Sequence, residues 1–410
     1  MTLAKTIPAT GDARSDVRTT GLIGSAHFTS HFLMLAPAPL LPLIKAEFDV
    51  SFTQLGLILT VFFATSGIGQ VVAGILVDRF GPHRLLLSGV CLQAAAIVAM
   101  GFAPHFSLLF PLAFLAGLGN TVYHPSDLSI LSRRITHRRQ GRAFATHSMA
   151  GTFGFAISPV AVGLAATQWG WRNALIAAGI VGLVVAVGLL LNRSWLRADD
   201  FHPHATSESE RNGGPAMKLD FFQMLALPAV TFGFGFFFLT ALAGASLMNF
   251  TVSALTEGYG VTLAWATVAI AAYQFGAIGG TLVGGLAADR WPYHHRIAIV
   301  GVIGAGLLTL PLIHTGLPLA LIVGFLLLSG AFGGATLPSR DLLIRQTAPR
   351  GNLGKTFGMV YSGLDGGSLI GPLVIGPMLD HGEPQLLFLT ASVAMGLATF
   401  TVLGIRGART

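Results

Sequence analysis

Long apolar stretches recur along almost the whole chain, and they constrain its fold more than any other feature. Because a helix of about 20 residues spans the hydrocarbon core of a bilayer, each stretch predicts a transmembrane helix. Membrane-spanning barrels need shorter segments of alternating hydrophobicity, so the sequence predicts an all-α membrane protein with 12 transmembrane helices. These lie at roughly residues 22–44, 53–77, 84–103, 107–131, 143–167, 172–192, 222–252, 263–288, 296–315, 317–345, 355–379 and 385–405.

The number and placement of charges support this interpretation. Only 10% of the 410 residues are charged and 53% are hydrophobic, which leaves too few charges to cover a soluble protein. The net charge of +7 would also suit a protein that binds nucleic acid. If the N-terminus is cytoplasmic, however, all of the 24 Lys and Arg except Lys45 and Arg172 fall on the cytoplasmic side of the membrane. This positive-inside asymmetry predicts cytoplasmic termini in a multi-pass protein of the bacterial cytoplasmic (inner) membrane, with no nucleic-acid partner.

A polar interruption divides six apolar segments from six. It contains ADDFHPHATSESERNGGP, a composition typical of a solvated linker. Residues 1–20 are polar and lack the apolar core of a signal peptide. We therefore predict a flexible cytoplasmic tail (1–20), an N-terminal six-helix half (21–192), a cytoplasmic linker (193–220) and a C-terminal six-helix half (221–410).

The two halves share landmarks at a nearly constant offset. GILVDRFGPHR recurs as GLAADRWPYHHR, which places Asp289 211 residues after Asp78. HPSDLSIL recurs as LPSRDLLI and GRAF as GKTF, and Pro338 follows Pro125 by 213 residues. Parallel repeats of six helices build one class of secondary transporter, in which the substrate site lies near the midplane between the halves.

The motif after the second apolar segment resembles a family signature. The pattern G-x-L-x-D-R-x-G, here Gly74 to Gly81, is similar to the signature between helices two and three of the major facilitator superfamily. The run Trp169–Arg172 resembles that family's common join between helices five and six, and the likeness covers essentially the whole chain. The resemblance implies the major facilitator fold: two pseudo-repeats of six helices.

Within this superfamily, GLGNTVYHP and PLLPLI are similar to motifs of the fosmidomycin-resistance exporters. The sequence also departs from that branch. It has His27 and His31 where those exporters tend to show His-x-x-x-Asp, and Ser126-Asp127 rather than Glu after the His-Pro pair.

The signature residues predict a conformational latch at the cytoplasmic face. Asp78 would accept hydrogen bonds from a neighbouring helix N-terminus or an Arg and so hold the two halves together. The alternative is a surface charge pair worth little energy. The predicted latch comprises Asp78, Arg79, Gly81, Asp289, Arg290 and Arg142.

Ionisable residues at bilayer depth are costly and therefore candidates for function. His27 and His31 share one face of the first helix, as His124 and Asp127 do on the fourth. In the family's architecture both helices line the central cavity, so the four side chains are predicted to form one proton-coupling or substrate-binding cluster. An imidazole suits proton exchange because its ordinary pKa lies near cytoplasmic pH. Pro125 is expected to open a bend nearby.

Plainer roles remain open for the same residues. His27 and His147 would then only hydrogen-bond backbone or water near the interface, and Asp127 would be a helix-end partner for Arg133 or Arg134. In the second half, Asp365 is expected near the midplane of the membrane. It would act there as a substrate or proton site, or it would form a structural ion pair with Arg340. Asp341 is a competing partner for Arg340. Further candidates for binding a solute are Tyr123, Tyr361, Asn249 and Gln274.

These features favour a proton-coupled secondary transporter that exports a small organic compound or drug by alternating access. GTFGFAISPVAVG resembles the helix-five motif of antiporters in this superfamily and favours export. We expect no enzymatic activity, no cofactor and no metal site in a protein that works as a monomer. Proton-coupled uptake of an organic anion, drawn by His⁺ and Arg340, is one alternative. A transition-metal transporter using His27, His31, His124 and His147 is another. A membrane sensor and an intramembrane enzyme have no supporting motif.

Overall fold

The computed structural model describes residues 13–197, 223–224, 226–347 and 353–407, and every regular element in them is a helix. This confirms the all-α prediction. The elements of the first part are α1 (Ala13–Leu35), η1 (Ala38–Leu40), α2 (Leu41–Phe48), α3 (Phe52–Phe80), α4 (Pro82–Gly101), η2 (Phe106–Leu108), α5 (Leu109–Asn120), α6 (Tyr123–Arg134), α7 (His137–Leu191) and η3 (Arg193–Trp195). Those of the second part are α10 (Pro228–Gly258), α11 (Leu263–Arg290), α12 (His294–Thr309), η4 (Leu310–Ile313), α13 (Leu319–Thr347), α14 (Leu353–Asp380) and α15 (Leu386–Gly407).

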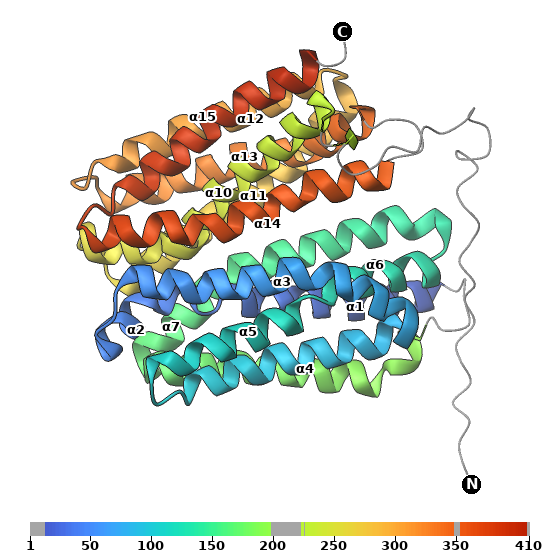
Figure 1. The fold of residues 1–410 in the computed structure, drawn as a ribbon, viewed down its shortest axis with the longest axis horizontal. Helices are drawn as coiled ribbons and strands as arrows, with labels where there is room; N and C mark the ends of the chain where they lie inside the picture. The colour runs from blue at the N-terminus through green and yellow to red at the C-terminus, as the bar shows by residue number, and fades with distance from the viewer. Residues whose placement is uncertain (1–12, 198–222, 225, 348–352, 408–410) are drawn as a thin grey trace. The chain divides into compact units, whose positions relative to one another are not determined.

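The chain forms two compact units. One contains residues 1–48 and 61–204, and the other contains residues 49–60 and 205–410. In the first unit, α7 packs along α1 and α4, and α4 also contacts α5. In the second unit, α10 packs along α14 and α15, and α12 contacts α13 and α15 (Figure 1). Equivalent helices of the sequence repeat thus make equivalent contacts within each unit.

The described residues contain ten helical segments long and apolar enough to cross a membrane. The difference from twelve arises in two places. α7 counts as one element of 55 residues, although Gly170, with a φ of 77°, breaks its helical geometry at a kink. This glycine separates the two predicted segments 143–167 and 172–192. The second place is α14, which covers the predicted segment 355–379 and is not among the ten.

The first helix begins earlier than the sequence indicated. α1 starts at Ala13, so residues 13–20, which were predicted to belong to a flexible tail, are helical. Asp16 explains the extension because its buried carboxylate accepts hydrogen bonds from Thr136 Oγ1 at 2.7 Å and Arg139 Nη1 at 3.1 Å. Of the predicted linker, residues 193–197 are described and include η3, and residues 198–220 lie outside the described part of the chain.

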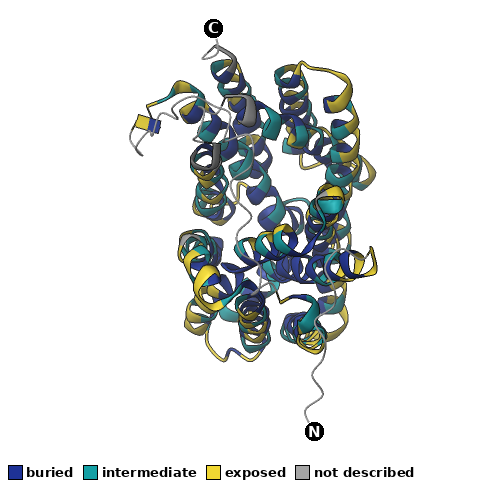
Figure 2. Cartoon of the chain, turned by 90° about the vertical axis from the view of Figure 1, so that its right-hand side faces the viewer, coloured by how far each residue is buried: buried dark blue, intermediate teal, exposed yellow. Residues whose placement is uncertain are grey.

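The outward faces of the helices are apolar. Large hydrophobic side chains such as Ile68, Val184 and Val283 are more than 60% exposed, which a soluble protein would not tolerate in such numbers. Buried residues face the interior of each helical bundle, whereas exposed ones gather on its outside (Figure 2). A lipid environment explains this pattern, since lipid tails solvate apolar side chains.

Candidate functional site

A break between α5 and α6 presents the polar run that begins at Tyr123. α5 ends at Asn120 and α6 starts at Tyr123, inside the single apolar segment predicted at 107–131. Pro125 accounts for the break, because it has no N–H to donate to the carbonyl of Thr121 and its ring crowds that carbonyl. The predicted bend at Pro125 is therefore present, and α6 projects His124 and Asp127 from its first turns.

Four imidazoles and one carboxylate meet in the first unit, on α1, α6 and α7. Asp127 Oδ2 lies 3.1 Å from His147 Nε2 and 3.4 Å from His27 Nδ1. The His27 ring stacks on His147 with centroids 3.7 Å apart, and it lies 4.4 Å from His31 and 5.0 Å from His124. We call these five residues the histidine cluster.

The histidine cluster combines buried and accessible members. Asp127 is fully buried, and His27 and His147 are almost completely buried, whereas His124 is exposed. Asp127 therefore pairs with imidazoles and not with the helix-end arginines: Arg133 pairs with Asp78, and Arg134 donates to the carbonyl of Arg197. The ring centroid of the exposed His124 lies 5.0 Å from that of His27 and 6.4 Å from that of His147.

Glycines on α7 allow this helix to approach the histidines of α1. A Cβ atom added at Gly151 would lie 2.6 Å from His27 Cδ2 and 2.9 Å from His31 Cε1. One turn later, a Cβ at Gly154 would collide with the carbonyl oxygen of Phe28. Ser158, in the same run GTFGFAISPVAVG, donates a 2.7 Å hydrogen bond to the carbonyl of Phe32. The motif thus fixes α7 against α1 beside the cluster.

A buried network of polar side chains lies beside the break. Asn120 accepts a hydrogen bond from Ser30 Oγ at 2.8 Å and donates one to Ser66 Oγ at 2.8 Å. Gln93 Nε2 donates to Asn120 Oδ1 and to the carbonyl of Ser30, both at 3.3 Å. The network joins α1, α3, α4 and α5 where α5 ends. Sequence reasoning missed it because single amides and hydroxyls in apolar helices show no periodic pattern.

Replacing Asn120 with Ala is expected to destabilise the protein. The substitution leaves buried groups on Ser30, Ser66 and Gln93 without their shared partner, at a cost of about 1–3 kcal/mol. Thermal unfolding of the purified protein would reveal a lower midpoint. Asn173→Ala is the control, because Asn173 is exposed and its side chain donates to the carbonyl of Trp169 on its own helix. Equal midpoints for the two variants would contradict this role.

In the second unit, the structure does not form the ion pair between Asp365 and Arg340 that was one of the two alternatives for Asp365. Arg340 Nε donates to Asp341 Oδ1 at 3.0 Å, and its guanidinium lies 4.2 Å from the ring centroid of Phe237. Tyr361 packs on the same phenylalanine, with ring centroids 4.8 Å apart. Asp365 is exposed, and no ion pair to it is found among the residues that the structure describes. In this structure Arg340 is therefore paired with Asp341.

Three other predicted binding residues lie in packed surroundings. Asn249 is buried and bonds to the carbonyl of Ala245 on its own helix, and Gln274 is also buried. Tyr123 is fully buried in an apolar cluster with Ile23 and Leu86. Their role in binding a solute stays a prediction.

The predicted latch residues lie at helix ends. Asp78 Oδ1 is 3.4 Å from Arg133 Nη2, a pair within the first unit. Gly81 has a φ of 86°, so a glycine is needed to turn the chain from α3 into α4. The other members of the predicted latch are exposed. Asp289 and Arg290 lie at the end of α11, and Arg142 lies in the first turns of α7. The guanidinium of Arg79 lies over the ring of Phe80.

Asp78→Asn is expected to leave membrane insertion and stability unchanged while reducing transport sharply. The Asp78 side chain is 77% exposed, and an exposed ion pair contributes about 0–1 kcal/mol to stability. Quantifying the membrane-inserted protein alongside its transport rate would test this. Full transport by the variant would remove the latch role.

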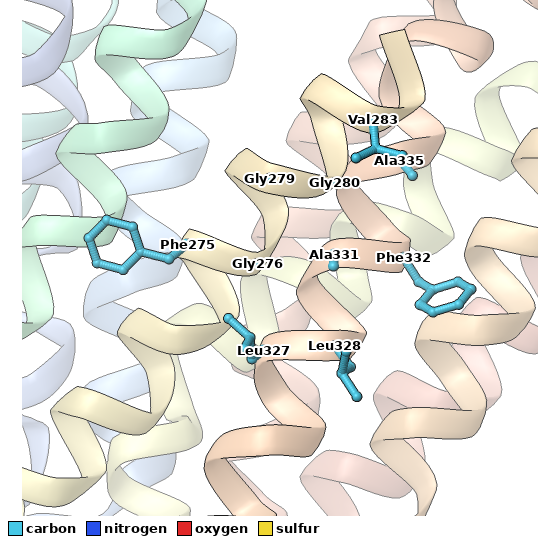
Figure 3. A pocket seen from close by; sticks show the side chains of 10 residues that line it. All are labelled: Phe275, Gly276, Gly279, Gly280, Val283, Leu327, Leu328, Ala331, Phe332 and Ala335. Carbon is cyan, nitrogen blue, oxygen red and sulfur yellow. The ribbon is translucent and has the colours of Figure 1, made fainter. Parts of the chain in front are cut away.

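An apolar groove of about 460 Å³ lies between α11 and α13 (Figure 3). Its lining contains no polar side chain that could orient a substrate, so it does not resemble a binding site. The lining residues are Phe275, Gly276, Gly279, Gly280, Val283, Leu327, Leu328, Ala331, Phe332 and Ala335.

The bundle architecture, apolar outer faces and intramembrane polar cluster define a membrane transporter, and comparison with known proteins gives its family. The Major Facilitator Superfamily model matches residues 23–245 and 234–409. The chain therefore belongs to the major facilitator superfamily, and it is a transporter, not an enzyme.

Individual relatives agree with this assignment. The chain is 24% identical to the fosmidomycin resistance protein of Escherichia coli (strain K12), over 93% of this chain and 91% of that protein. It is 26% identical to the gentisate transporter of Corynebacterium glutamicum (strain ATCC 13032), over 88% and 82% of the two chains. The crystal structure of the nucleoside transporter NupG has the same fold, with a TM-score of 0.77, 12% identity, and coverage of 94% and 99%. The predicted resemblance to the fosmidomycin-resistance branch is confirmed.

Proposed function

We propose that this protein is a proton-coupled antiporter that exports a small organic compound by alternating access. In this proposal twelve helices cross the bacterial inner membrane and both termini are cytoplasmic. The observation that carries it is the histidine cluster, in which the buried carboxylate of Asp127 contacts His27 and His147 while His124 is exposed nearby.

The cluster has the parts that proton exchange requires. His124 is accessible and can take up a proton, and the Asp127 carboxylate can stabilise the resulting positive charge on its neighbours. A solute that binds preferentially to one protonation state would couple its own movement to that of the proton. Asp365, exposed on α14, is the candidate for contact with the solute in the second unit.

Export receives support from two sources. The antiporter-like motif packs α7 directly against the histidines of α1, so rearrangement of α7 would reach the cluster. The extensive likeness to a fosmidomycin resistance protein favours a drug or a drug-like acid as substrate. Uptake of an organic anion has less support, because its proposed attraction point Arg340 is already paired with Asp341.

Everted membrane vesicles, energised to be acid inside and containing a fluorescent pH reporter, would test this function. Fosmidomycin, gentisate, other organic acids and a panel of drugs would be added to wild type, His124→Ala and Asp365→Asn. The proposal predicts that at least one solute releases protons only with wild-type protein. Solute movement without proton release in wild type would contradict antiport.

A further inference from the structure

Three imidazoles of the histidine cluster converge closely enough to share one metal ion. His27, His124 and His147 come from α1, α6 and α7, and one ring nitrogen of each lies within 4.8 Å of the others. Asp127 Oδ2 adds an oxygen donor at 3.4 Å from His27 Nδ1 and 3.1 Å from His147 Nε2. Three imidazole nitrogens from three helices therefore converge, and a carboxylate oxygen lies beside two of these imidazoles.

The separations between these atoms suit tetrahedral coordination. Metal–ligand bonds of about 2.0–2.1 Å at tetrahedral angles place neighbouring donors about 3.3–3.4 Å apart. Both contacts of Asp127 already fall close to that value. The remaining nitrogen separations need a contraction of about 1–1.5 Å at most, by the same geometry. Because His124 is exposed, its ring has room to make that movement.

Three buried atoms of the cluster have no hydrogen-bond partner among the described residues: His27 Nδ1, His31 Nδ1 and Asp127 Oδ1. Those of His27 and Asp127 belong to residues of the converging set. Leaving a buried polar atom unsatisfied costs about 1–3 kcal/mol. Coordination to a cation would satisfy the His27 nitrogen and balance the charge of the carboxylate. This is a second observation, independent of the convergence of the rings, that indicates a ligand.

We propose that His27, His124, His147 and Asp127 form a binding site for a divalent transition-metal ion of the zinc class. Three imidazole nitrogens and a carboxylate oxygen are the donors that such ions prefer, and no cysteine is among the four residues to select Cu(I). The site does not depend on which organic solute the protein moves. The main expectation from the sequence was no metal site, although these three histidines and His31 were the ligands considered for a transition-metal transporter. The ligands are dispersed over three helices, and their spacing matches no metal motif.

Cobalt binding to the purified, untagged full-length protein would test the site. Tetrahedral Co²⁺ absorbs visible light strongly, which reports coordination independently of transport. Wild type is expected to bind one Co²⁺ that Zn²⁺ displaces. His124→Ala and His147→Ala each remove a direct ligand, so their affinity should fall by at least the roughly 10–100-fold that loss of an outer-shell partner causes.

His105→Ala is the matched control, because His105 is an exposed histidine of the same unit outside the cluster. Cobalt binding that survives both cluster substitutions, or no cobalt binding by wild type, would overturn the proposal. Solute-driven proton release is measured separately, with a chelator present, to distinguish the two proposals. If the protein releases protons but binds no cobalt, the metal-site proposal fails and the antiport proposal stands.

Discussion

Asp127→Asn is expected to abolish proton-coupled transport while the protein still inserts and folds. The carboxylate is fully buried and contacts His27 and His147 on two other helices. The amide has nearly the same shape and can still hydrogen-bond to an imidazole, but it carries no charge. Without the negative charge, protonation of the cluster becomes unfavourable, and we expect proton-linked transport to fall by about tenfold or more, equivalent to at least about 1.4 kcal/mol.

The measurement is the initial rate of solute-driven proton movement per inserted protein. Asp49→Asn provides the matched control, because it makes the same chemical change at an exposed residue. Asp49 has a φ of 51°, a conformation that Asn also tolerates, so this control is not expected to strain the backbone. Equal rates for Asp127→Asn and wild type would show that the buried carboxylate plays no part in coupling.

Gly151→Ala should produce the second large effect. Its new methyl group would overlap His27 Cδ2 and Nε2, at 2.6 and 2.7 Å, and His31 Cε1 at 2.9 Å. Either α7 or the two rings must shift, which disturbs the geometry around Asp127. Such overpacking costs about 1–3 kcal/mol, so we expect a modestly lower unfolding temperature and a loss of transport of about tenfold or more.

Gly188→Ala, on the same element, separates this steric effect from the general consequences of adding a methyl group. A Cβ at Gly188 meets nothing within 4 Å. The variant should therefore transport normally and unfold at the wild-type temperature or slightly above it. If Gly151→Ala behaves in the same way as Gly188→Ala, close approach of α7 to the histidines has no functional role.

Much of the architecture was readable from the sequence because hydrophobic segments and repeated motifs are local signals. The helical class and the bend at Pro125 depend on such signals. The start of α1 at Ala13 does not: it requires Asp16 to reach Thr136 and Arg139, more than a hundred residues away. Helix boundaries set by distant partners cannot be read from periodicity.

The candidate site was only partly predictable for the same reason. Helical spacing correctly placed His27 beside His31, and the depth of each residue suggested that α1 and α6 would bring histidines together. For His147 the sequence left open a role limited to the interface, and the depth of the residue did not show that it stacks on His27 and contacts Asp127. Its position depends on Gly151 and Gly154, which let α7 approach α1. Such contacts depend on how the helices pack against one another, and this packing cannot be predicted from a single sequence.

Proton movement in proteoliposomes containing wild type or His124→Ala tests the central claim most directly. A gradient of the transported solute is the only driving force, and a trapped dye reports internal pH. The histidine cluster predicts that solute flux moves protons in wild type, and that His124→Ala allows the solute to move downhill without them. Equal proton movement in both proteins would contradict a coupling role for this histidine, and solute flux without proton movement in wild type would contradict antiport itself.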